Sequence, residues 1–124
     1  MATRGAVLIL ENEYLIAGLL AEWVTAAGCT VVGPVATVAT AHALINDHGI
    51  DAAFLDVQLD GNERSFELAA CLQAMRVPFA FITGYSRPSW PLAFQRVPFF
   101  SKPLVSEDVS NLLSQLLPPP GGHT

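Results

Sequence analysis

Five short apolar runs recur along the chain and constrain its fold more than any other feature. They lie at 7–10, 30–33, 51–55, 77–82 and 97–100. The runs are continuous rather than alternating, which is typical of strands that are buried on both faces. Because each run is separated from the next by a segment long enough for a crossover, the strands are expected to pair in parallel.

Four of the intervening or following segments carry the pattern of a helix with one buried face. They span 16–27, 38–48, 65–75 and 104–117. Strands that alternate with helices predict an α/β fold, here a doubly wound five-stranded parallel sheet with helices on both faces. In the first helix we expect the buried face to consist of Ile16, Leu19, Leu20, Trp23, Val24 and Ala27.

The segment between the fourth and fifth runs breaks this regularity. Pro88 and Pro91 lie three residues apart and leave little more than 92–96 for a helix. We therefore expect the fourth helix to be short or irregular, with Trp90 and Phe94 partly exposed.

Length, charge and composition limit the classes of function. A chain of 124 residues is long enough for one domain, expected at 1–117, with a disordered Pro/Gly tail at 118–124. A formal net charge of −5 argues against nucleic-acid binding. Neither a membrane span nor an export signal is apparent, so we expect a cytoplasmic protein without membrane contact. Cys29 and Cys71 are too few for a disulfide framework or a zinc site and are expected in the core.

Polar residues follow four of the apolar runs, at the point where each strand would end. The carboxyl ends of parallel strands meet at one edge of the sheet, where ligand sites of open α/β folds lie. The residues at these ends are Glu11 and Asn12, Asp56, Thr83, and Lys102, which is the only lysine of the chain.

This combination of side chains suits phosphoryl chemistry. Oxygen ligands around Asp56 favour a hard divalent cation such as Mg²⁺ or Mn²⁺. A hydroxyl from Thr83 and an ammonium from Lys102 would hold phosphoryl oxygens. Taken singly, each residue has a simpler explanation as a helix cap, a turn residue or a solvated charge. Their joint occurrence at four strand ends favours a functional site.

In the order of these residues, the chain resembles the response-regulator receiver family from the first strand through the last helix. The motif Phe81-Ile82-Thr83-Gly84-Tyr85 looks like the Phe-Ala-Thr-Gly motif of small stand-alone receivers of alphaproteobacteria. The resemblance implies a flavodoxin-like sheet with strand order 2-1-3-4-5 and a cis peptide between Lys102 and Pro103.

The resemblance also implies a role for each site residue. Asp56 would be the phosphoacceptor, and Thr83 and Lys102 would complete the catalytic set. Thr83 and Phe99 would form the switch, although Phe99 is equally well explained as a core residue of a short strand. Gln58 and Tyr85 would flank the phosphoryl group and control the access of water. The implied metal ligands are Glu11, Asn12, Asp56 and the main-chain carbonyl of Gln58.

The expected function is that of a phosphoacceptor in a two-component phosphorelay. A histidine kinase or histidine phosphotransfer protein would phosphorylate Asp56, and the chain would signal by contact with a downstream protein, whose identity and any homodimer stay open. No dedicated enzyme activity is expected beyond metal-assisted self-phosphorylation and self-dephosphorylation. Asn12 departs from the acidic pair of the family, which leaves a phosphorylation-independent docking module as the alternative. A flavin or nucleotide binder lacks support, since no Gly-rich loop follows the first strand.

Overall fold

The computed structural model describes residues 4–84 and 90–118. Strands and helices alternate along them, with two single 3-10 turns. The strands are β1 (Ala6–Leu10), β2 (Thr30–Val35), β3 (Ala52–Asp56), β4 (Phe79–Thr83) and β5 (Phe99–Ser101). The helices are α1 (Tyr14–Ala26), α2 (Val38–Asp47), α3 (Phe66–Ala74) and α4 (Ser106–Leu116), and the turns are η1 (Asp60–Asn62) and η3 (Leu92–Phe94).

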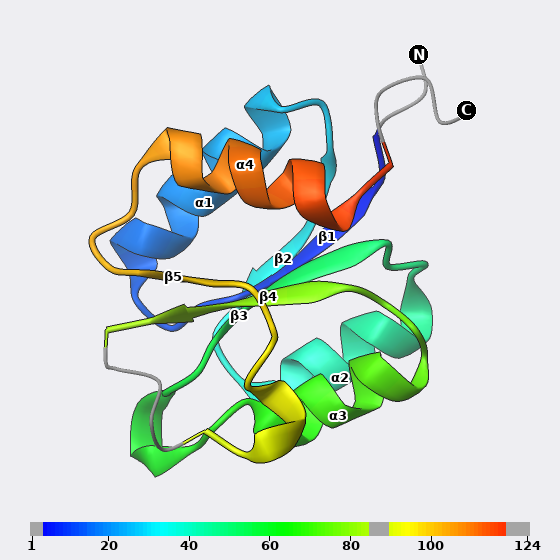
Figure 1. The fold of residues 1–124 in the computed structure, drawn as a ribbon, viewed down its shortest axis with the longest axis vertical. Coiled ribbons are helices and arrows are strands. Elements are labelled where there is room, and N and C mark those ends of the chain that lie inside the picture. Colours follow the sequence, from blue (N-terminus) through cyan, green and yellow to red (C-terminus); the bar gives the residue numbers. More distant parts are fainter. Residues whose placement is uncertain (1–3, 85–89, 119–124) are drawn as a thin grey trace.

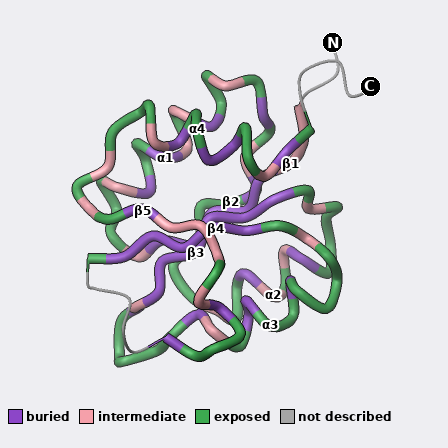
Figure 2. The backbone as a smooth tube through the Cα atoms, viewed as in Figure 1, coloured by how far each residue is buried: buried purple, intermediate pink, exposed green. Residues whose placement is uncertain are grey.

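The five strands form one parallel sheet in the order β2-β1-β3-β4-β5, which confirms the expected fold. In Figure 1 the helices α1 and α4 lie on one face of this sheet, and α2 and α3 lie on the other. Every residue of β3 and β4 is buried, as the colouring of the central strands in Figure 2 shows. Burial on both faces explains why these strands are continuous apolar runs in the sequence.

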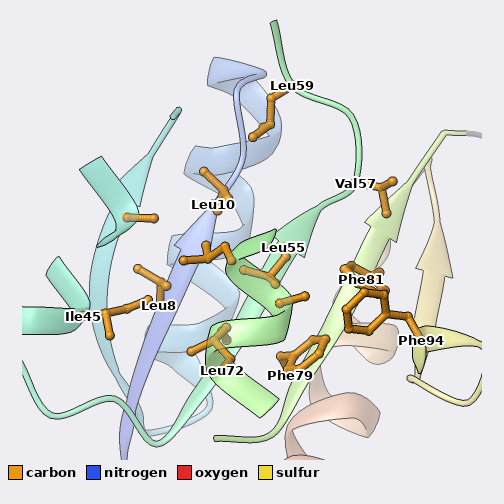
Figure 3. Close-up of a cluster of buried hydrophobic side chains, with 14 of the residues drawn as sticks. Leu8, Leu10, Ile45, Leu55, Val57, Leu59, Leu72, Phe79, Phe81 and Phe94 are labelled. Carbon is orange, nitrogen blue, oxygen red and sulfur yellow. The ribbon is translucent and has the colours of Figure 1, made fainter. Parts of the chain in front are cut away.

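Side chains of each strand alternate between two hydrophobic clusters, one on each face of the sheet. From β1, Val7 and Ile9 enter the cluster that α1 and α4 cover, together with Leu20 of α1 and Leu113 of α4. The intervening Leu8 enters the cluster on the α2 and α3 face. Figure 3 shows that second cluster, which contains both aliphatic and aromatic side chains. The sheet is therefore held by packing from both sides.

The second strand is longer than expected because it continues past Gly33. This glycine has φ +100°, and a Cβ atom there would lie 3.0 Å from the Val35 main-chain nitrogen and 3.1 Å from the Ile9 carbonyl oxygen. Pairing with β1 resumes with Leu10 opposite Val35, after a register shift. The expected end at residue 33 was wrong because glycine and proline usually interrupt a strand, whereas here Gly33 permits a close approach to β1.

Two positions of α1, Ala17 and Leu19, differ from the expected buried face. The buried residues of the helix are Ala17, Leu20 and Val24. Leu19 is 43% exposed, so its predicted core position was wrong. Successive helix residues are about 100° apart around the axis, and the sheet and α4 cover the side that carries Leu20.

The aromatic cluster, which we define as Phe66, Phe79, Phe81, Trp90, Phe94 and Phe99, corrects another expectation. The described part of the segment between β4 and β5 contains only the turn η3, which confirms the irregular fourth helix. Trp90 and Phe94 are nevertheless only 6% and 4% exposed, so the prediction of partial exposure was wrong. The Phe66 ring stacks on Phe94 at a centroid distance of 5.6 Å, and Phe81 contacts Trp90 at 4.9 Å. Aromatic rings of α3 and β4 therefore bury Trp90 and Phe94, although these two residues do not belong to a regular helix.

The helix lengths, the two cysteines and the C-terminal end test three further expectations. None of the described helices is long and apolar enough to cross a bilayer. Cys29 is buried but Cys71 is exposed, so the core placement was right for one cysteine and wrong for the other. The end of the expected domain, Leu117, is buried and is followed by an exposed Pro118. The rest of the expected tail lies outside the described residues, and its disorder stays a prediction.

Candidate functional site

Polar side chains gather at the carboxyl edge of the sheet, as the strand ends predict. Glu11 follows β1, Asp56 ends β3 and Thr83 ends β4. Their exposed fractions are 2%, 3% and 1%. Burying polar groups this deeply costs free energy unless they are paired, which makes this edge a candidate site rather than part of the core.

Lys102 connects this group of side chains. Its ammonium donates hydrogen bonds to Asp56 Oδ2 at 3.2 Å, to Glu11 Oε2 at 3.3 Å and to Glu13 Oε1 at 2.5 Å. Its main-chain N–H donates to the Thr83 carbonyl at 2.9 Å, which ties the residue to the end of β4. The peptide between Lys102 and Pro103 is cis, as the family resemblance implies. One ammonium is therefore shared by three carboxylates.

The ionisation of the site reflects this crowding. Burial, reinforced by the neighbouring Asp56, raises the pKa of Glu11 to about 7. Burial alone would lower the pKa of Lys102, but its hydrogen bond to Glu13 and the charges of Asp56 and Glu11 raise it. Lys102 is thus held as a cation, while the surrounding carboxylates outnumber it.

The carboxylates fit a divalent cation. Ligand oxygens of Glu11, Glu13 and Asp56 lie within 4.8 Å of one another. Glu11 Oε1 is buried and has no hydrogen-bond partner among the described residues. Hard cations such as Mg²⁺ and Mn²⁺ prefer oxygen ligands of this kind. The donor set therefore suits the metal that the sequence predicts, with Glu13 in addition to the expected ligands.

An open pocket of about 350 Å³ lies in front of Asp56 and gives it access to solvent. We call it the acidic pocket. Its opening beside a buried carboxylate provides room for a small charged group. It is lined by Asn12, Glu13, Asp56, Gln58, Leu59, Asp60, Gly84 and Lys102.

Two of the expected metal ligands, Asn12 and Gln58, lie in this lining. The Asn12 side chain donates from Nδ2 to Asp60 Oδ1 at 2.9 Å. The Gln58 main-chain N–H donates to Asp56 Oδ1 at 3.3 Å. Both residues therefore lie at the pocket, and Asn12 is already bonded to a carboxylate there.

The remaining predicted residues lie apart from the pocket or outside the described chain. Phe99 is half-buried, and its ring meets that of Trp90 edge to face at a centroid distance of 5.4 Å. This contact fits the core interpretation and leaves a switching role as a prediction. Tyr85 lies outside the described residues.

From the sequence, Glu13 is expected near the cation site but is not among the predicted ligands, and Asp60 is not predicted at all. Glu13 is the N-cap residue of α1 and lies next to Asn12. Asp60 begins the turn η1, where Gly61 has φ +69°, and this turn brings Asp60 to the Asn12 side chain. The Asp60-Gly61 pair is a turn signal in the sequence, but the direction of the turn depends on the fold.

Comparisons with solved structures found close matches over nearly the whole chain. The solution structure of SdrG from Sphingomonas melonis Fr1 is 41% identical, with a TM-score of 0.82, over 94% of this chain and 98% of that one. The BeF3-activated conformation of SdrG from Pseudomonas melonis Fr1 is also 41% identical, with a TM-score of 0.78 and the same coverage of both chains. The Erythrobacter litoralis PhyR response regulator REC domain is 27% identical, with a TM-score of 0.78, over 90% of this chain and 88% of that one. A scan against models of protein families found no match, and neither did a search of curated proteins.

Proposed function

The chain belongs to the response-regulator receiver family, and on that basis we propose that it accepts a phosphoryl group on Asp56 in a two-component phosphorelay. The observation that carries this proposal is the Lys102 ammonium, 3.2 Å from Asp56 Oδ2 beside a pocket that is open to solvent. The donor would be a histidine kinase or histidine phosphotransfer protein in the cytoplasm. The output would be contact with a downstream protein.

The transfer step uses the residues at the strand ends. A carboxylate oxygen of Asp56 attacks the phosphorus of a phosphohistidine, the N–P bond breaks as the O–P bond forms, and the histidine leaves with the electron pair and takes up a proton. The Lys102 ammonium holds one phosphoryl oxygen, and the Thr83 hydroxyl donates to another.

The cation site lies on the same carboxylates. Glu11, Asn12, Asp56 and the Gln58 main-chain carbonyl would hold Mg²⁺ or Mn²⁺, which neutralises charge on the transferred group. The buried Oε1 of Glu11, which has no hydrogen-bond partner among the described residues and lies 3.3 Å from the Lys102 ammonium, supports this assignment. A buried carboxylate oxygen needs a positively charged or hydrogen-bonding neighbour, and a divalent cation would provide one.

A response to phosphorylation would begin at Thr83. The phosphoryl group would add close to two negative charges at the end of β3, beside the end of β4. Drawing the Thr83 hydroxyl toward it would bias the neighbouring Phe99. Gln58 and Tyr85 would flank the group and control hydrolysis. The contact of Phe99 with Trp90 offers a route from this change to the aromatic cluster.

Incubation with acetyl phosphate and Mg²⁺, followed by intact mass spectrometry, tests the proposal. We expect one added phosphoryl group that hydroxylamine removes, since hydroxylamine cleaves acyl phosphates. Asp56→Asn should abolish the addition, whereas Asp60→Asn, which changes a carboxylate of the same pocket, should retain it. Mass that persists in Asp56→Asn, or no added mass in the wild type, would contradict the proposal.

A second candidate is a docking module that works without phosphorylation. Asn12 favours it, because an amide at this position removes one formal charge from the cation site. In that case, Asp56→Asn would bind the partner as tightly as the wild-type protein does, with and without acetyl phosphate. A change in partner affinity on phosphorylation would exclude it.

A further inference from the structure

The amide nitrogen at position 12 is committed to a neighbouring carboxylate. A carboxylate only accepts hydrogen bonds, so the atom of Asn12 that faces Asp60 at 2.9 Å must be the amide nitrogen. An aspartate at position 12 would place two carboxylates against each other at this point. The neutral side chain is therefore matched to Asp60, and the cation site must obtain its third carboxylate elsewhere.

Glu13 is in the right place to supply that carboxylate. It is the N-cap residue of α1, but its side chain makes no capping hydrogen bond with the described residues of that helix. It turns instead toward Lys102, with an oxygen within 4.8 Å of ligand atoms of both Glu11 and Asp56. With its side chain 55% exposed, it can reorient at the mouth of the pocket.

The buried Glu11 contributes a second carboxylate at the same place. One of its oxygens, Oε2, accepts from the Glu13 main-chain N–H at 2.9 Å. The other, Oε1, has no hydrogen-bond partner among the described residues, although its side chain is fully buried. It lies 3.3 Å from Lys102 Nζ, on the side where the three carboxylates meet. The Lys102 ammonium is therefore its charge partner, and a divalent cation would give this oxygen a direct ligand contact.

We propose that Glu13 supplies the carboxylate that position 12 lacks, so that the carboxylate ligands of the divalent cation are Glu11, Glu13 and Asp56. This inference rests on the proposed function and concerns the same site. The Lys102 ammonium lies among these carboxylates. A divalent cation would compete with it there and release the ammonium for the phosphoryl group.

Calorimetric titration with Mg²⁺, together with detection of free Mn²⁺ by electron paramagnetic resonance, measures cation affinity directly. We expect Glu13→Gln to weaken the affinity by roughly tenfold or more, since even the loss of a group that only orients a metal ligand typically costs about 10–100-fold. Glu22→Gln is the matched control, since it removes the same charge from an exposed position of α1. It should change the affinity less than twofold.

Restoring the acid at position 12 sharpens the test. We expect Asn12→Asp to tighten cation binding, because it returns a carboxylate to the site. In the Asn12→Asp background, Glu13→Gln should then weaken binding less than it does in the wild type, since the two positions provide the same ligand. Equal effects in both backgrounds would overturn the inference, because position 13 would then act independently of position 12.

The outcomes separate this inference from the proposed function. If wild type binds the cation and is phosphorylated, but Glu13→Gln binds as tightly as Glu22→Gln or more tightly, then Glu13 only neutralises Lys102 and the inference is overturned. If wild type shows no saturable binding at millimolar Mg²⁺, metal-assisted phosphorylation fails as well. Thermal melting of each variant verifies that the proteins compared are folded.

Discussion

The acidic pocket and the aromatic cluster share strand β4 but are held together in different ways. Phe81 and Thr83 lie two residues apart on that strand, so their side chains leave the same face of the sheet. Phe81 meets the rings of Phe66, Phe79, Trp90 and Phe94. Burial and packing stabilise that region without any ligand.

The pocket, by contrast, buries charges that repel each other. Three carboxylates surround one ammonium. The raised pKa of Glu11 reflects the free energy needed to hold its charged form in this buried place, next to Asp56. Paired buried charges rarely add net stability compared with apolar packing. The aromatic cluster therefore adds to the stability of the fold, whereas the pocket holds charged groups together at a cost in stability, as a site for the proposed cation and phosphoryl group would.

The largest expected change in stability is in the aromatic cluster. Phe81→Ala should lower the free energy of unfolding by about 3–5 kcal/mol, because it removes a fully buried ring and leaves a cavity. Urea denaturation followed by circular dichroism measures this loss. Leu92→Ala, at a side chain that is 91% exposed, should change stability by less than about 0.5 kcal/mol. If Phe81→Ala lowered the free energy of unfolding no more than Leu92→Ala does, the aromatic cluster would not be the main source of stability in this comparison.

The pH dependence of stability tests the pocket. The folded pKa of Glu11 is raised from 4.5 to about 7, so the folded protein holds this proton more tightly than the unfolded chain does. The contribution is present below pH 4.5 and is lost as pH rises through 7, and it amounts to roughly 3 kcal/mol at most. With chelator present, wild type should therefore lose more stability between pH 4.5 and 8 than Glu11→Gln. Identical pH profiles would show that Glu11 does not carry this cost.

Removing the ammonium should expose the repulsion that it offsets. At pH 8 without a divalent cation, Lys102→Met should be about 2 kcal/mol less stable than wild type, since the buried carboxylates lose their partner. Millimolar Mg²⁺ should restore part of the loss, because a ligand that binds only the folded state stabilises it. Arg96→Met, at an exposed position, is the control for the change in net charge. A Lys102→Met variant that matches this control would mean that the pocket needs no internal cation.

The smallest effect distinguishes ring geometry from burial within the aromatic cluster. Phe66 is stacked on Phe94 with an interplanar angle of 9° and meets Phe81 edge to face. Phe66→Leu retains an apolar side chain but loses these contacts, so we expect a cost of about 1 kcal/mol. Thermal denaturation and the near-ultraviolet circular dichroism of Trp90 report the change. If Phe66→Leu is as stable as the wild-type protein, Phe66 stabilises the cluster through its buried apolar surface and not through the geometry of its ring.

Much of the fold could be predicted because its signals are local. Continuous apolar runs and helical spacing depend on residues that are neighbours in the chain, and parallel pairing follows from the length of the segments between strands. The same reasoning placed Glu11, Asp56, Thr83 and Lys102 at one edge. It failed at Leu19 and at residue 33, since helical spacing does not say which side the sheet will cover and Gly33 is read as a strand end unless its contact with β1 is known.

By itself, the sequence determined the sheet, the order of its elements and the identity of the residues at the strand ends. Only the tertiary structure decided that Trp90 and Phe94 are buried, because the rings that cover them come from α3 and β4. It also decided that Asn12 bonds Asp60 and that Glu13 meets Lys102. The physical reason is the same in each case: a side chain's partners are set by distances across the fold, and the residue spacing along the chain carries no record of them.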